Sequence, residues 1–215
     1  MIATSNQLIA LKEEIGNRSK DIDMLISLLH DRLSSAQDKD KDIVPCLSAV
    51  VMLGLYNILE YLLSECISFI CDEIKSNNIT YFFIQPEIRE ILYKQATKCK
   101  REEVEKLFHH TSCQFTPERG QVISGNIGFR QLQSILKSFC LLGEENNLPA
   151  NRSMIDLDTL KDIRNNISHG NKGLSSVKYT YSDIEQFYEH MKELFLFIMD
   201  RLELCINEKK YHISP

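Results

Sequence analysis

The sequence lacks tryptophan and is poor in turn-forming residues, with eight glycines and five prolines in 215 residues. So few glycines and prolines indicate few turns and long secondary-structure elements. A composition with 43% hydrophobic and 26% charged residues excludes disorder, collagen and low-complexity sequence, and is that of an ordinary soluble globular protein. We expect a single helical domain over residues 1–215, without internal repeats or a long linker.

An excess of positive charge is also missing, since the formal net charge is −5 at pH 7. This balance excludes a generic polyanion-binding surface, so any site for RNA or DNA must be local. Between residues 151 and 180 the charges sum to +2, against −7 in the rest of the chain. That segment suits a small anionic ligand such as a structured RNA loop, although a solvated loop of mixed charge gives the same balance.

The seven cysteines contain no C-x-x-C pair. Most of them lie in apolar runs, which indicates buried thiols in a reducing, cytoplasmic compartment and neither a disulfide framework nor a zinc site. We expect no signal peptide, because charged residues interrupt the N-terminal segment at Lys12. The apolar stretch at 43–74 carries several acidic and amide side chains, so we expect a buried helix there and no membrane partner.

Common cofactor and metal signatures are missing too. The chain has no P-loop, no dinucleotide-binding glycine pattern, no H-E-x-x-H and no G-x-S-x-G. His109, His110 and Cys113 lie close together, but three donors do not complete a structural zinc site. A partly exposed helix end is the simpler interpretation of that cluster, and we expect neither a metal nor a cofactor.

The spacing of apolar residues predicts several helices. Apolar side chains recur every three or four positions from about 5 to 35, which indicates a long amphipathic helix within residues 1–40. A second long helix is predicted at 44–76, antiparallel to the first. The remaining predictions are helices at 86–98, 101–109, 128–142 with Gly143 as its stop, 156–170 with Gly170 at its end, and 182–208 with a Ser182–Glu185 capping box, and an irregular loop at 111–128.

The predicted helix at 156–170 ends in an R-x-x-x-x-H spacing, Arg164 to His169. Histidine can act as general base or acid at a ribose 2′-hydroxyl and arginine can hold a phosphate, so the pair fits metal-free RNA cleavage. At about 100° per residue, Asn165 lies about 40° from His169, whereas Arg164 lies about 140° from it. Two copies about a two-fold axis could join both residues in one cleft. A solvated arginine and a histidine at the negative end of the helix dipole are the alternative.

Three segments carry a family resemblance. One is Arg164 to Gly170, with asparagine directly after the arginine and glycine directly after the histidine. The others are Tyr56-Asn57-x-x-Glu60, in the apolar second helix, and Ser124-Gly125-Asn126. Together they resemble the HEPN domains (higher eukaryotes and prokaryotes nucleotide-binding), and most closely the stand-alone MAE-type HEPN-like nucleases, over roughly residues 45–208.

The resemblance implies an all-α, HEPN-like helical bundle with two long antiparallel helices and a short motif-bearing helix. It also implies a homodimer whose shared active site cleaves RNA without a metal, as in toxin–antitoxin, restriction and antiviral systems, with an antitoxin as a possible further partner. Arg164 and His169 would be catalytic, and Asn165 would orient the phosphate or the histidine.

Three further residues are candidates for supporting roles. The resemblance implies that Glu60 and Asn57 hold Arg164. Three positions apart on one helical face, they also fit a simple buried polar contact or an interhelical salt bridge. Lys161 belongs to the positively charged segment and is expected to support substrate binding.

Two other functions fit the same sequence. A catalytically inactive HEPN module would bind a nucleotide or a partner protein, with Arg164 contacting phosphate. A structural helical adaptor would use the first helix, at 5–35, for assembly. Only the ribonuclease requires His169 for activity.

Overall fold

A computed structural model describes residues 2–35, 43–96, 123, 125–142, 148 and 152–213. Within these ranges the regular secondary structure is helical, and the single pairing of extended backbone is an isolated antiparallel bridge between Ile84 and His212. The predicted all-α fold is therefore confirmed. The predicted helix at 101–109, most of the loop at 111–128, and the cluster of His109, His110 and Cys113 lie outside the described residues.

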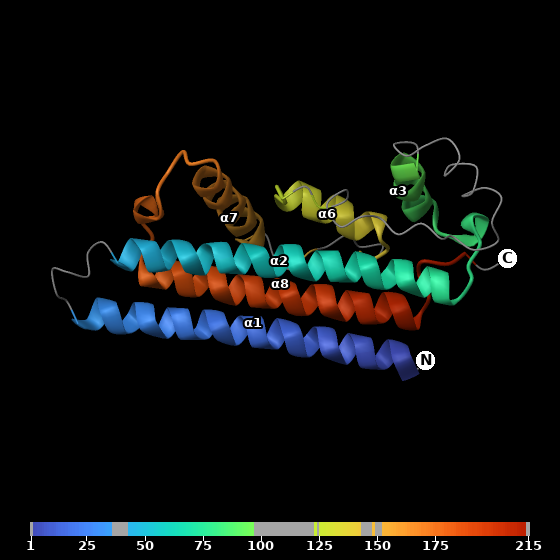
Figure 1. The fold of residues 1–215 in the computed structure, drawn as a ribbon, viewed down its shortest axis with the longest axis horizontal. Helices are drawn as coiled ribbons and strands as arrows, with labels where there is room; N and C mark the ends of the chain where they lie inside the picture. Colours follow the sequence, from blue (N-terminus) through green and yellow to red (C-terminus); the bar gives the residue numbers. More distant parts are fainter. Residues whose placement is uncertain are drawn as a thin grey trace.

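Three long helices pack along one another: α1 (Ile2–Ser35), α2 (Ile43–Ser76) and α8 (Tyr181–Asn207). Figure 1 shows α1 running antiparallel to both α2 and α8. The shorter helices α3 (Pro86–Ala96), α6 (Phe129–Ser138) and α7 (Arg152–Ser168) lie on the side of α2 that faces away from α1 (Figure 1). Two short 3-10 helices, η2 (Tyr81–Phe83) and η3 (Leu174–Ser176), complete the described elements.

α2 is the central helix of the core. Its apolar residues are distributed around the helix, and it contacts α1, α7, α8 and η3. Leu55, Leu59, Leu62 and Leu63 are fully buried in these contacts. Length and a mean hydropathy of 1.8 over an 18-residue window would also suit a membrane-crossing helix, but here the same apolar surface packs against neighbouring helices.

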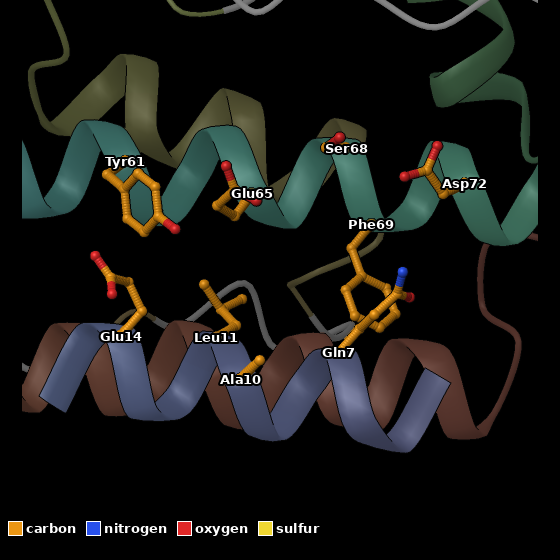
Figure 2. A pocket seen from close by; sticks show the side chains of 9 residues that line it. All are labelled: Gln7, Ala10, Leu11, Glu14, Tyr61, Glu65, Ser68, Phe69 and Asp72. Carbon is orange, nitrogen blue, oxygen red and sulfur yellow. The ribbon is translucent and has the colours of Figure 1, made fainter. Parts of the chain in front are cut away.

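A groove of about 300 Å³ lies between α1 and α2, and Figure 2 shows the side chains that line it. Arg18 lies beside it, with its guanidinium carbon 3.9 Å from the centre of the Tyr61 ring and Nε 2.7 Å from Glu14 Oε1. α7 lies on the other side of α2 (Figure 1), so this groove is separate from the R-x-x-x-x-H helix.

The predicted helix at 128–142 ends four residues earlier than expected. α6 stops at Ser138, and Cys140 takes the left-handed conformation with φ 60° that the sequence assigned to Gly143. The Leu141 N–H donates to the Leu136 carbonyl at 2.8 Å, while both leucine side chains are buried. This is a Schellman end, in which an apolar contact across the last turn stabilises the reversal even without glycine.

The helix predicted at 156–170 also has different ends. α7 begins at Arg152, since no glycine or proline interrupts the turn before Asp156, and its last residue is Ser168. Gly170 follows with φ 69°, and its N–H donates to the Ile167 carbonyl at 3.0 Å. His169 therefore occupies the C-cap position between helix and turn.

The capping box of α8 involves a different pair from the predicted Ser182 and Glu185. Thr180 is the N-cap, and its hydroxyl oxygen accepts the Asp183 N–H at 3.2 Å. The Asp183 carboxylate accepts the Thr180 hydroxyl at 2.7 Å and the Thr180 N–H at 2.9 Å, and these two bonds hold the pKa of Asp183 below its ordinary value. The helix thus begins at Tyr181, because Thr180 has an extended backbone and its hydroxyl satisfies a first-turn amide.

Candidate active site

Arg164 lies on the face of α7 that packs against α2. Leu157 and Leu160 on that face are buried, and Arg164 follows them at the helical spacing of three and four residues. The guanidinium is therefore carried into the helix–helix interface, and its side chain is half-buried. A charge in such a place requires polar partners.

Glu60 of α2 is the opposing charge. Its carboxylate accepts a hydrogen bond from the Tyr56 hydroxyl one turn earlier, and the positive charge of Arg164 acts on it. Burial raises the pKa of Glu60, and Arg164 and Tyr56 offset only part of that rise. Oε1 of Glu60 is buried without a hydrogen-bond partner within the described part of the chain. Glu60 thus lies near Arg164 as a hydrogen-bond acceptor, although burial of its carboxylate costs free energy.

A short segment between α2 and α6 closes this pair from a third side. The Ile127 N–H donates to the Tyr56 hydroxyl oxygen at 2.5 Å, which fixes the segment on α2. Burial raises the pKa of Tyr56 to about 12, so its hydroxyl stays protonated at neutral pH and can donate to Glu60. Tyr56 therefore links the segment to the carboxylate.

The backbone of Gly125 passes close to the Arg164 guanidinium. It has φ 66°, and a Cβ added there would lie 2.8 Å from Arg164 Nη2 and 3.7 Å from Glu60 Oε1. Both the left-handed backbone and the missing side chain therefore require glycine at this position.

Asn165 connects Arg164 to the same segment. Its Oδ1 accepts a hydrogen bond from Arg164 Nη1 at 3.2 Å, and its Nδ2 donates to Asn126 Oδ1 at 2.7 Å. Glu60, Gly125 and Asn165 thus surround the guanidinium from three segments that are far apart in sequence.

A family model described as HEPN_MAE_28990-like HEPN matches residues 8–211. The chain belongs to this HEPN family. Comparison with curated proteins and with solved structures finds no match. Membership supports an RNA-related or nuclease role for the domain, while the roles of individual residues rest on the geometry of the site.

Among the predicted site residues, this HEPN domain brings Arg164, Asn165 and Glu60 together. It leaves Asn57 and His169 on the surface, since both side chains are exposed. Asn57 is one residue past Tyr56, and its exposed position takes it out of the buried contact between Glu60 and Arg164. His169 donates its backbone N–H to the Asn165 carbonyl at 3.0 Å, so the helix geometry fixes its backbone.

Lys161 has partners on its own helix. Its Nζ lies 3.4 Å from Asp158 Oδ1 and 3.6 Å from Asp162 Oδ1. Asp158 also accepts the Phe129 N–H at 3.2 Å, which places a carboxylate at the N-terminus of α6. The structure gives Lys161 and Asp158 a part in joining α6 to α7, and a supporting role of Lys161 in substrate binding stays a prediction.

Tyr56, Gly125 and Asn126 complete the site, but no role was assigned to them from sequence. The signal was present, because Tyr56 opens the Y-N-x-x-E element and the other two lie in the S-G-N stretch. Spacing could not reveal their function, since they come together only when the segment before α6 packs against α2 and α7.

A second polar contact fixes the start of α7. His190 Nδ1 of α8 forms a short contact with the Asp156 carboxylate, and both side chains are largely buried. The motif helix is therefore joined to α8 at one end and to α2 at the other. Within the described ranges no group of three or more histidine, cysteine or acidic residues could hold a metal.

The raised pKa of Glu60 predicts the effect of removing its charge. Because its pKa is raised on folding, Glu60 binds a proton more strongly in the folded chain than in the unfolded chain. The free energy of unfolding therefore falls as the pH rises above 4.5, the ordinary pKa, and passes through the raised pKa of the folded state. We expect Glu60→Gln to raise the free energy of unfolding at pH 7, measured by urea denaturation. The difference from wild type should vanish below pH 4.5.

Glu193→Gln, at an exposed position of α8, is the matched control and should follow the wild-type profile. A Glu60→Gln variant that is less stable than wild type at pH 7 would contradict the prediction. It would mean that attraction to Arg164 exceeds the cost of burying the carboxylate.

Proposed function

We propose that the protein is a metal-independent endoribonuclease. One observation carries the proposal. A single helix of a HEPN domain presents the Arg164 guanidinium, which Glu60, Gly125 and Asn165 enclose, and five residues later the exposed His169. A toxin or defence effector acting in the cytoplasm is the setting that we propose for it, with an antitoxin as a possible partner.

The proposed reaction transfers a phosphoryl group within RNA. The ribose 2′-oxygen forms a bond to the adjacent phosphorus as the bond to the 5′-oxygen of the next nucleotide breaks, leaving a 2′,3′-cyclic phosphate and a 5′-hydroxyl. His169 takes the proton of the 2′-hydroxyl or gives one to the leaving oxygen. Arg164 contacts the phosphate and opposes the negative charge that grows on it.

The enclosure of Arg164 supports this role. Three segments hold the guanidinium, so its position is set before RNA arrives and little order is lost on binding. Glu60 is retained although burial raises its pKa, and groups kept at such a cost are typical of functional sites. Asn165, bonded to both Arg164 and Asn126, limits rotation of the guanidinium.

The proposed active site is shared by two subunits. Arg164 faces α2, whereas His169 lies about 140° around the helix and is exposed. An exposed C-cap histidine can reach a phosphate held by the arginine of a second copy across a two-fold axis.

A catalytically inactive binding module is the second candidate, because Glu60 opposes the charge of Arg164 within one chain. In that case the domain would bind a nucleotide or a partner protein, and His169 would be dispensable.

Substitution of His169 tests the chemistry directly. In EDTA, we expect wild type to cut total cellular RNA and leave 2′,3′-cyclic phosphate ends, while His169→Ala loses about 10²–10⁴-fold in rate because general acid–base catalysis is removed. His30→Ala, with 61% of the His30 side chain exposed on α1, is the matched control and should keep wild-type activity. Equal rates for wild type and His169→Ala would exclude this residue, and no cutting by wild type would favour the binding module.

Gly125→Ala tests the enclosure of Arg164. We expect at least a tenfold loss of cleavage rate, since the new methyl group displaces the guanidinium. The positive φ should cost only about 1–2 kcal/mol of stability, which urea denaturation can measure beside the rate. Gly16→Ala on α1, where an added Cβ meets nothing within 4 Å, is the control. A folded Gly125→Ala variant with wild-type activity would contradict a catalytic role for the enclosed arginine.

Mixing two inactive variants tests the shared site. If His169 of one subunit acts with Arg164 of the other, then Arg164→Ala mixed with His169→Ala should recover on the order of a quarter of wild-type activity, because half of the dimers keep one complete pair. Each variant alone, incubated under the same exchange conditions, is the control. No recovery in demonstrably mixed dimers would assign both groups to one subunit.

A further inference from the structure

A second groove, of about 280 Å³, lies at the C-terminal end of α7. One wall is α7, which contributes Asn166 together with the apolar side chains of Ile163 and Ile167. The other wall is the segment after the helix, with Lys172 and Lys178 among its lining residues. The groove therefore combines an apolar surface with two cationic side chains.

The groove carries positive charge that neighbouring carboxylates do not neutralise. Both lysines are exposed, and within the described part of the chain neither forms an ion pair. The two carboxylates that act on nearby Tyr179 have other partners, since Asp183 belongs to the Thr180 capping box and Asp162 lies 3.6 Å from Lys161 Nζ. Uncompensated positive charge at a concave site of an acidic protein favours an anionic ligand.

An aromatic side chain completes the lining. The Tyr179 ring packs edge-on against Phe187, with 5.5 Å between ring centroids and an interplanar angle of 85°, and this contact fixes its orientation. Burial raises the pKa of Tyr179, so its hydroxyl is a neutral donor at physiological pH. Proteins that bind single-stranded nucleic acids combine such side chains, because lysines contact the phosphates and an aromatic ring stacks on a base.

The groove is joined to the R-x-x-x-x-H segment by Asn166. The Asn166 carbonyl accepts the Lys172 N–H at 3.1 Å, which folds the segment back on the helix end. Asn166 and His169 are three residues apart and therefore about 60° apart around the helix. His169 does not line the groove, but these angles place it on the neighbouring part of the helix surface.

We propose that this groove binds the ribose–phosphate backbone of single-stranded RNA at a nucleotide next to the cleaved bond. Lys172 and Lys178 contact phosphate oxygens, and the Tyr179 ring packs against a base or ribose. This assignment rests on the ribonuclease function proposed above and gives that site a substrate-positioning surface.

Binding to a labelled single-stranded RNA, followed by fluorescence anisotropy, tests the groove apart from the chemistry. The full-length His169→Ala chain serves as the non-cleaving background. Adding Lys172→Gln and Lys178→Gln should weaken binding on the order of tenfold at low salt. It should also reduce the slope of log Kd against log salt by about 1.4, or about 0.7 for each phosphate that is no longer neutralised. In the His169-containing enzyme the same pair should raise KM with little change in kcat.

Two control pairs make the result specific. Lys20→Gln with Lys137→Gln removes the same charge from exposed positions of α1 and α6 and should leave the Kd and the salt slope unchanged. Lys172→Arg with Lys178→Arg keeps the charge and should retain binding. Equal Kd and slope for the groove and control glutamine pairs would overturn the proposal.

The outcomes separate this proposal from the ribonuclease itself. RNA binding that depends on the two lysines, in a wild-type protein that cuts no RNA, would support the groove and contradict the ribonuclease. If the variant with Lys172→Gln and Lys178→Gln cuts RNA with the KM and salt slope of wild type, the proposed role of the groove would be overturned and the proposed ribonuclease activity would stand. If the two lysines are needed to bind a polyglutamate peptide while their substitution leaves the affinity for RNA unchanged, the groove would belong to an acidic protein partner. That result would overturn the proposal that the groove binds RNA.

Discussion

The site depends on two opposite charges placed near each other between two helices, Arg164 on α7 and Glu60 on α2, both half-buried. For Glu60, burial outweighs the attraction of the positive charge of Arg164, as the raised pKa of the carboxylate indicates. The arrangement is tolerated because the surroundings supply polar partners: Tyr56 donates to the carboxylate and Asn165 accepts from the guanidinium. Gly125 then allows a backbone to close over the pair. The fold thus brings three distant segments together around one half-buried arginine.

The same helix places its two key residues in different environments. Leu157 and Leu160 fix which face of α7 meets α2, and Arg164 continues that face. The left-handed turn at Gly170 then ends the helix and leaves His169 outside. Because the reversed segment folds back on Asn166, the turn that exposes the histidine also builds the wall of the neighbouring groove. Packing and helix termination together therefore create an enclosed arginine, an exposed histidine and a positively charged groove within one short stretch of chain.

Periodicity predicted the long helices well, since the apolar spacing of α1 and the apolar run of α2 are strong local signals. Helix ends were less predictable, because tertiary contacts decided them. α6 ends before a left-handed cysteine, where Leu136 and Leu141 are both buried and joined by a backbone hydrogen bond. Thr180 took the capping position expected of Ser182. At the site, resemblance identified Arg164 and Glu60, which the structure brings together. The part played by Gly125 could not be predicted from spacing, because it depends on packing between segments that are far apart in the chain.

The balance at Glu60 also bears on how an enclosed arginine can serve a substrate. A guanidinium with a fully satisfied carboxylate partner would have little attraction left for a phosphate. Here the carboxylate is held weakly, with a raised pKa and one oxygen without a hydrogen bond within the described chain. A phosphate that approaches Arg164 brings a second negative charge, which favours the protonated form of Glu60 still further. The cost of burying Glu60 is therefore consistent with an arginine whose position is set in advance and whose charge is only partly offset by the neighbouring carboxylate.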